Sequence, residues 1–243
     1  MLTNYKLILS YDGTNYYGYQ KQPFLDTIQS ILEKSLYKIT KQKILTYAAS
    51  RTDKGVHALG QVVSFKTHFF IQPKIFQKIL NNILPADIRV INIKEVNNSF
   101  HARYSSKSKI YKYIFAKEPL DFLNCRFQVY FKKIDFMIIN KAIKLLEGEK
   151  DFSLFTSNKD KNKSTIRYIL KVCSKETSKH YCLFFHGRSF LKQMILFLVG
   201  FLIKIGYNQK KISDLKDMLE LKNKQKLPFL APSKGLYLKK VFY

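Results

Sequence analysis

Residues 44–67, ILTYAASRTDKGVHALGQVVSFKT, decide the fold. The two ends of this segment, ILTYAAS and QVVSFKT, are rich in β-branched and aromatic residues, which favour strands. The run between them, RTDKGVHALG at residues 51–60, is polar and contains glycines, so it predicts a loop. The segment therefore predicts two strands joined by a loop that carries Arg51, Asp53, Lys54 and His57.

Strand and helix patterns flank this segment on both sides. YKLILSY, from Tyr5, predicts a strand, and a helix is expected from Thr27, whose hydroxyl can cap the first turn. Apolar residues recur at helical spacing after Pro73, and IRVINIKEV from Ile88 predicts another strand. The order β-α-β-β-α-β indicates a ferredoxin-like unit, an antiparallel sheet with helices on one face, which RNA-recognition modules also use.

The second half of the chain repeats this scheme without repeating the sequence. Its expected elements are a strand at IYKYIFAK, a helix over residues 135–146 that ends by Gly148, strands near Arg167 and Tyr181, an apolar helix after Ser189, a short helix after Ser213 and a closing strand, GLYLKKVFY. The polar run YSSKSK at residues 104–109 marks the boundary. We therefore predict an α+β protein with an N-terminal ferredoxin-like half over residues 1–105 and a second over residues 106–243.

The charge of the chain favours a polyanionic partner. Its 43 Lys and Arg against 17 Asp and Glu give a formal charge of +26, which indicates nucleic acid before membrane. A genome that is rich in Lys codons would explain much of this charge as well, so charge alone does not decide. Residues 156–164, TSNKDKNKS, predict a mobile basic loop, because they contain no large apolar side chain and many Lys and Asn residues.

Other classes of protein are disfavoured. The three cysteines show no CxxC spacing, which favours a reducing compartment over a disulfide framework, and no His pattern suits zinc. No signal peptide is evident at the start, and the apolar run at residues 194–203 is about half of a membrane span, so it predicts a buried core helix. We expect a cytoplasmic protein without a metal or another cofactor.

The loop at residues 51–60 is the candidate for chemistry, because loops held by a scaffold commonly carry catalytic residues. Taken alone, Asp53 beside two cations is equally compatible with a turn residue in a salt bridge. The same holds for Arg51, and Tyr111 could be a core residue, since strand alternation puts Tyr111 and Tyr113 on one face.

Several ordered motifs resemble the tRNA pseudouridine synthase I family, which acts at positions 38 to 40 of the anticodon arm. RTDKGVHA matches the RTDxGVHA signature, and YDGTNYYGYQKQ from Tyr11 is similar to YDGTxYxGWQxQ, with Tyr19 where the family usually has Trp. The resemblance continues through FHARYSSKSKIYKYIF, DFSLF, KSTIR, GRSFLKQM and APSKGLYL, and so covers nearly the whole chain.

The resemblance implies roles for individual residues. Asp53 is the expected nucleophile, which would attack the sugar or the base while the uracil leaves ribose, turns and rejoins through carbon. Tyr111 would stack on the base and take part in proton transfer, and Arg51 would help to flip the target nucleotide. Lys54 and His57, in the same signature, are expected to bind substrate. The implied enzyme is a homodimer that binds tRNA in a basic cleft completed by the second half.

One departure concerns the cation expected beside the catalytic carboxylate. Where the family commonly reads MVR, this chain reads Met194, Ile195 and Leu196, so the Arg is missing. Lys192 is four residues before Leu196, and Arg188 is eight before it, on the loop entering the expected helix. Either could supply the cation and bind substrate, with Lys192 favoured because a one-turn offset places it on the same helical stripe as Leu196. The alternative is that Lys192 points to solvent or to RNA phosphate.

Two other readings remain open at this point. One is a non-catalytic basic RNA-binding module on the same scaffold, which would gain nothing from an Asp facing phosphates. The other is an unrelated basic ferredoxin-like protein in which RTD is a structural turn.

Overall fold

A computed structural model describes residues 2–157, 160, 162–222 and 229–243. The chain divides into two compact units, residues 1–107 together with 237–243, and residues 108–236. The division after residue 107 falls within the polar run at residues 104–109. The closing strand belongs with the first unit, whereas the sequence placed it in the second half.

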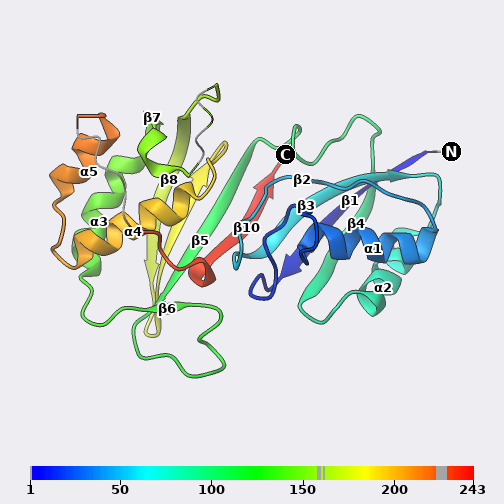
Figure 1. The fold of residues 1–243 in the computed structure, drawn as a ribbon, viewed down its shortest axis with the longest axis horizontal. Helices are drawn as coiled ribbons and strands as arrows, with labels where there is room; N and C mark the ends of the chain where they lie inside the picture. The colour runs from blue at the N-terminus through cyan, green and yellow to red at the C-terminus, as the bar shows by residue number, and fades with distance from the viewer. Residues whose placement is uncertain (1, 158–159, 161, 223–228) are drawn as a thin grey trace. The chain divides into compact units, whose positions relative to one another are not determined.

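The first unit consists of a sheet and two helices (Figure 1). Its elements are β1 (Thr3–Tyr11), α1 (Ile28–Thr40), β2 (Tyr47–Ala48), β3 (His57–Thr67), α2 (Pro73–Ile83), β4 (Ile88–Val96) and β10 (Leu236–Phe242). The order β4-β1-β3 is antiparallel throughout, and β2 pairs antiparallel with β3. Strand β10 runs parallel to β3, with Tyr237 opposite His57. The two predicted helices, from Thr27 and after Pro73, are confirmed, and so are the strands predicted from Tyr5 and from Ile88.

The core of the first unit lies between the sheet and the helices. Alternate residues of β1, among them Tyr5 and Leu7, are fully buried, as strand periodicity requires. The ring of Phe76 from α2 meets the ring of Tyr5 edge to face at 5.3 Å and that of Phe65 from β3 at 6.0 Å. This burial fixes which face of the sheet the helices cover.

The second unit is also mixed α+β. Its elements are β5 (Ser108–Ala116), β6 (Val129–Tyr130), α3 (Phe136–Ala142), the 3₁₀ helices η1 (Ile143–Leu146), η2 (Ser153–Phe155) and η3 (Ser233–Gly235), β7 (Gly148–Asp151), β8 (Ile166–Glu176), β9 (His180–Gly187), α4 (Met194–Gly206) and α5 (Ile212–Leu219). Strands β5-β9-β8-β7 are antiparallel, and β6 runs parallel to β5.

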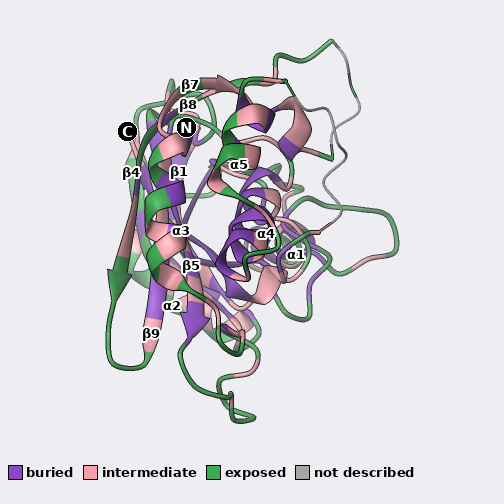
Figure 2. Cartoon of the chain, turned by 90° about the vertical axis from the view of Figure 1, so that its left-hand side faces the viewer, coloured by how far each residue is buried: buried purple, intermediate pink, exposed green. Residues whose placement is uncertain are grey.

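Helix α4 is buried along nearly its whole length (Figure 2). All of its residues except Phe197 and Lys204 are buried, which confirms the core helix expected from the apolar run. No helix among the described residues is long and apolar enough to cross a membrane. The basic loop expected over residues 156–164 lies partly outside the described residues.

Three predicted boundaries are wrong. The strand expected over ILTYAAS, residues 44–50, is reduced to β2 at Tyr47–Ala48. Strand β3 begins at His57, inside the segment expected to be a loop, because β10 supplies a pairing partner that no local pattern reveals. The helix expected over residues 135–146 is α-helical only to Ala142 and then tightens into η1. Its start is as expected for a capped helix, since the Asp135 carboxylate accepts from the N–H groups of Met137 and Ile138.

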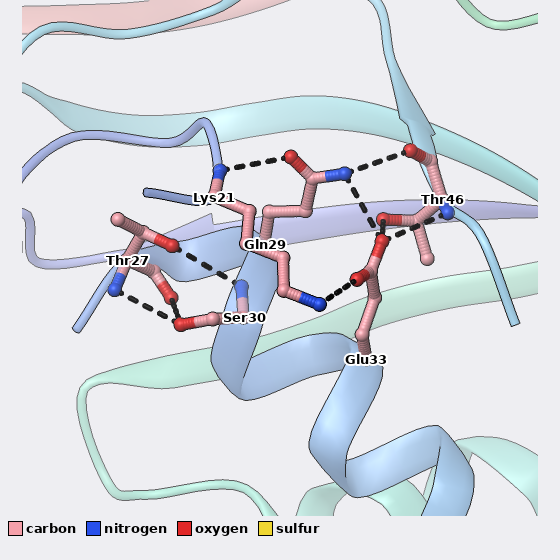
Figure 3. A network of polar contacts seen from close by, with 6 residues as sticks. All are labelled: Lys21, Thr27, Gln29, Ser30, Glu33 and Thr46. Atoms are coloured by element: carbon pink, nitrogen blue, oxygen red, sulfur yellow. Dashed lines mark hydrogen bonds and ion pairs between the residues drawn. The ribbon is translucent and has the colours of Figure 1, made fainter. Parts of the chain in front are cut away.

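The start of α1 is held by a network of polar contacts (Figure 3). Thr27 caps the helix as predicted, in a reciprocal pair with Ser30. One turn on, the Glu33 carboxylate is 8% exposed and accepts hydrogen bonds from the Thr46 N–H and hydroxyl, both at 3.1 Å, and from Gln29 Nε2 at 3.0 Å. Lys21 Nζ lies 3.4 Å from the same carboxylate. The network joins α1 to the chain that enters β2.

Replacing Glu33 by Gln tests this network. The amide has one acceptor oxygen in place of two, and its NH₂ group would face the donor groups that now bind the carboxylate. We therefore expect a loss of about 1–3 kcal/mol in the free energy of unfolding. Urea denaturation followed by circular dichroism measures it. Asp26→Asn is the matched control: its ion pair with Lys34 is 3.9 Å long between side chains that are 69% and 68% exposed, and its removal should change stability by less than about 0.5 kcal/mol.

Candidate functional site

The loop that carries Asp53 is fixed at both ends. Gln61 from β3 accepts from the Ser50 N–H at 3.3 Å and donates to the Ser50 carbonyl at 2.6 Å. The hydroxyl groups of Tyr11 and Thr52 lie 2.8 Å apart, and burial raises the pKa of Tyr11 to about 12, so its hydroxyl stays protonated. A turn closed by the Val56 N–H on the Asp53 carbonyl, at 3.1 Å, completes the loop and leaves Asp53 half-buried.

Two glycines of the YDGTNYYGYQ segment lie against the backbone of this loop. A Cβ on Gly13 would stand 2.0 Å from the Val56 carbonyl oxygen, and one on Gly18 would stand 2.8 Å from the Thr52 carbonyl oxygen. Gly18 also has a φ of +88°, which disfavours any larger residue. The Tyr19 N–H donates to the Thr52 carbonyl at 3.0 Å. This segment, residues 11–20, which we call the first motif, therefore packs directly on the loop that carries Asp53. The sequence did not predict this contact.

The remaining residues of the signature differ in exposure. Lys54 is exposed, and its ammonium lies 4.0 Å from the centre of the Tyr17 ring, a cation–π contact. Arg51 is exposed and lines a cavity of the first unit. Within this unit, Arg51, Asp53 and Lys54 thus share one loop, as predicted.

His57 belongs to a strand and is buried. It is 1% exposed, and its Nδ1 lies 3.1 Å both from the Asp12 carboxylate and from the Gly13 nitrogen. Nδ1 serves one of these partners at a time, donating to the carboxylate when protonated and accepting from the N–H when not. The ring stacks on Tyr237 of β10 at 4.8 Å. These contacts fasten the first motif to β3.

Tyr111 lies on the buried face of β5, in the second unit. It is 5% exposed, and its ring meets that of Phe190 edge to face at 5.3 Å. A Cβ on Gly187 would stand 2.8 Å from the Phe190 ring, so the absence of a side chain there lets that ring fold back. Tyr113, on the same face as predicted, is a core residue: its hydroxyl donates to the Pro232 carbonyl at 2.9 Å, and burial raises the pKa of its phenol.

The two candidate cations, Arg188 and Lys192, precede α4. The Arg188 guanidinium lies 5.1 Å from the centre of the Tyr168 ring, and the exposed Lys192 accepts the Thr156 hydroxyl on its carbonyl at 3.0 Å. The expectation that Lys192 shares a helical stripe with Leu196 is wrong. Gln193 has a φ of +59°, so the helix begins only at Met194 and Lys192 stands in the turn before it.

The chain was compared with known proteins. The family model described as tRNA pseudouridine synthase matches residues 7–105 and 142–243. Among curated proteins named tRNA pseudouridine synthase A, that of Phytoplasma mali is 57% identical over 241 residues, covering 99% of this chain and 98% of the relative. That of Onion yellows phytoplasma is 53% identical with 98% of each chain covered, and that of Acetivibrio thermocellus is 36% identical with 100% of each covered.

The family model covers the Asp53 loop, the alignments to the curated relatives cover Tyr111 as well, and these relatives bear the name of an enzyme. A non-catalytic RNA-binding module finds no support among them. The chain belongs to the tRNA pseudouridine synthase family and is an isomerase.

Proposed function

We propose that this enzyme converts uridine to pseudouridine at positions 38, 39 and/or 40 of the anticodon stem-loop of tRNA. The observation that carries the proposal is the Asp53 loop: Asp53 is half-buried, and the residues around it are held by contacts from Gln61 to Ser50, from Tyr11 to Thr52, and from Gly13 and Gly18 to the loop backbone. Such fixation suits a nucleophile, because a positioned group avoids the entropy cost of finding its target. Similarity over the whole chain to enzymes of this name supports the same reaction.

The reaction balances without an added oxidant, reductant or group donor. The bond from C1′ of ribose to N1 of uracil breaks, the base turns, and a bond from C1′ to C5 forms, while the proton on C5 moves to a nitrogen. In this proposal Asp53 adds to the sugar or the base in the interval, as carboxylates do in covalent catalysis, and leaves when the new bond has formed. No resident cofactor or metal is required for these steps.

The other side chains have supporting roles in this proposal. Arg51 helps to displace the target nucleotide, since a stacked base must be extruded before attack. Tyr111 stacks on the extruded base, and its hydroxyl can relay the proton at C5. Lys54 contacts phosphate, whereas His57 acts through the fold by holding the first motif to β3. We also propose a cytoplasmic homodimer that is built from ferredoxin-like halves; the order β4-β1-β3-β2 of the first unit supports that scaffold.

Asp53→Asn should abolish isomerisation while leaving tRNA affinity within a few fold, because the amide keeps the shape and removes the nucleophile. Tritium release from C5-labelled tRNA measures the reaction, and fluorescence anisotropy measures binding. Asp26→Asn, a change of the same chemistry on an exposed side chain, should keep full activity. Substantial turnover by Asp53→Asn would sink the assignment.

Affinity for tRNA should fall steeply with salt. Lys and Arg that neutralise phosphates release condensed counterions, so log affinity should decrease linearly with log salt, by nearly one unit of slope per phosphate contact. The charge of +26 leads us to expect several such contacts. Anisotropy titrations between about 50 and 200 mM salt give the slope. A dissociation constant that does not change with salt would contradict phosphate recognition.

Arg188→Met and Lys192→Met separate the two candidates for the missing cation. The cation that favours the charged form of Asp53 should, when removed, move the acidic limb of the pH–rate profile to higher pH and lower the single-turnover rate at neutral pH. The other variant should change affinity alone, as a phosphate contact would. Unchanged pH profiles in both variants would show that Asp53 stays ionised by other means.

A further inference from the structure

The cavity that Arg51 lines has a lining suited to an anion. Its volume is about 920 Å³, and it lies within the first unit, between the chain around β2, the end of β3 and residues 98–104. The cationic side chains among its lining residues are Lys43, Arg51, Lys66 and Arg103. None of the lining residues that the structure describes is acidic. A polyanion therefore gains charge compensation here without facing a carboxylate.

Three aromatic rings follow one another along this cavity; we call them the ring cluster. The ring of His101 lies 4.7 Å from that of Tyr47 and 4.4 Å from that of Tyr104, centre to centre. The Arg103 guanidinium lies 5.6 Å from the centre of the Tyr104 ring. Tyr47 is 46% exposed and Tyr104 is 77% exposed, so a ligand can reach both residues from solvent. Exposed aromatic rings beside cations are the means by which proteins bind unpaired nucleotides.

The turn that carries His101 and Tyr104 is held in place. The Nδ1 of His101 accepts from the N–H groups of Arg103 at 3.1 Å and of Tyr104 at 3.3 Å. Burial is the main cause that lowers the pKa of His101, with the nearby Arg103 charge adding to it. The ring is therefore neutral near pH 7, and because Nδ1 is an acceptor, its proton is on Nε2, where it can be donated to a base or a phosphate.

Tyr47 is fixed from both sides. It pairs with Ser64 in the β2–β3 ladder, and the Ser64 hydroxyl accepts from the Ala102 N–H at 3.0 Å, which brings residue 101 beside Tyr47. On the other side, Thr46 is bound by the buried Glu33 carboxylate (Figure 3). The backbone that carries the rings is thus held before any ligand binds, which lowers the entropy cost of bringing them together for stacking.

We propose that the ring cluster binds unpaired nucleotides of the RNA substrate that neighbour the target uridine. The bases stack on Tyr47 and Tyr104, and their phosphates lie against the cations of the cavity. Arg51, which lines the cavity, precedes Asp53 by two residues, so a strand bound there continues to the catalytic loop. Bases within a duplex have no open face for these rings, which is why unpaired nucleotides are the fitting class. This inference rests on the proposed function.

The test is a pair of double variants, Tyr47→Leu/Tyr104→Leu and Tyr47→Phe/Tyr104→Phe. The first removes both rings, and the second keeps the rings and removes only the hydroxyl groups. Tyr37→Leu is the matched control, because Tyr37 is 48% exposed on α1 and does not line the cavity. For each protein, anisotropy with unmodified tRNA gives the dissociation constant, and tritium release under saturating enzyme gives the single-turnover rate.

We expect the Leu pair to bind tRNA about tenfold more weakly or worse, with a nearly unchanged saturated rate, and the Phe pair and Tyr37→Leu to bind like the unmodified protein. Thermal unfolding checks the fold; if the Leu pair is unstable, Tyr104→Leu alone is used, since this side chain is 77% exposed. Unchanged affinity in the Leu variants overturns the inference. Equal losses in the Leu and Phe pairs overturn stacking as its cause.

Failure of the proposed function would look different. If the unmodified protein bound tRNA but released no tritium, isomerisation would be refuted. The contrast between the Leu and Phe pairs in binding would still decide whether the ring cluster holds RNA. A crosslink settles the location: p-benzoylphenylalanine at position 104 should label unpaired nucleotides of the anticodon arm, and labelling confined to duplex regions counts against the inference.

Discussion

The direct contact of backbone with backbone between the first motif and the Asp53 loop is the constraint on which the site depends. There is no room for a Cβ on Gly13 or Gly18, because the carbonyl oxygens of Val56 and Thr52 lie directly against these two residues. Packing at this distance has no slack, because backbone atoms cannot change rotamer to relieve a clash. The residues that follow β1 therefore hold the backbone of the loop against the sheet, so the backbone that carries the Asp53 side chain has a defined position.

Two buried side chains, His57 and Tyr11, also help to hold this arrangement. His57 and Tyr11 bear groups that could act in catalysis, yet both are buried; Nδ1 of His57 lies against Asp12 and Gly13, and the Tyr11 hydroxyl lies against Thr52 and Gln61. In the proposed function these two residues act through the fold, because their contacts hold the residues around Asp53. The exposed members of the same segment, Arg51 and Lys54, remain available for RNA. Within this short segment the buried residues hold the loop in place, and the exposed residues face solvent.

The sequence predicted what local physics controls. Thr27 caps α1, Pro73 starts α2, and the apolar run before Gly206 forms a buried helix, because capping and hydrophobic periodicity act within a few residues. Features set by distant partners were missed. The start of β3 depends on β10, and the meeting of Tyr47 with His101 depends on Ser64, so no window of sequence contains either signal. The prediction that Lys192 lies on the same helical face as Leu196 failed for a local reason. Gln193 adopts a left-handed backbone conformation, which its residue type did not reveal.

The return of β10 to β3 has a consequence for synthesis on the ribosome. Tyr237, which stacks on His57, and Tyr243, whose hydroxyl donates to the Ala102 carbonyl at 2.8 Å, are translated after the whole of the second unit. The first unit therefore cannot be completed until residues 237–243 have left the exit tunnel, after the second unit has emerged. A nascent chain that stalls before β10 leaves the start of β3 without this partner beside the Asp53 loop, so the scaffold around that loop is finished only after β10 has been made.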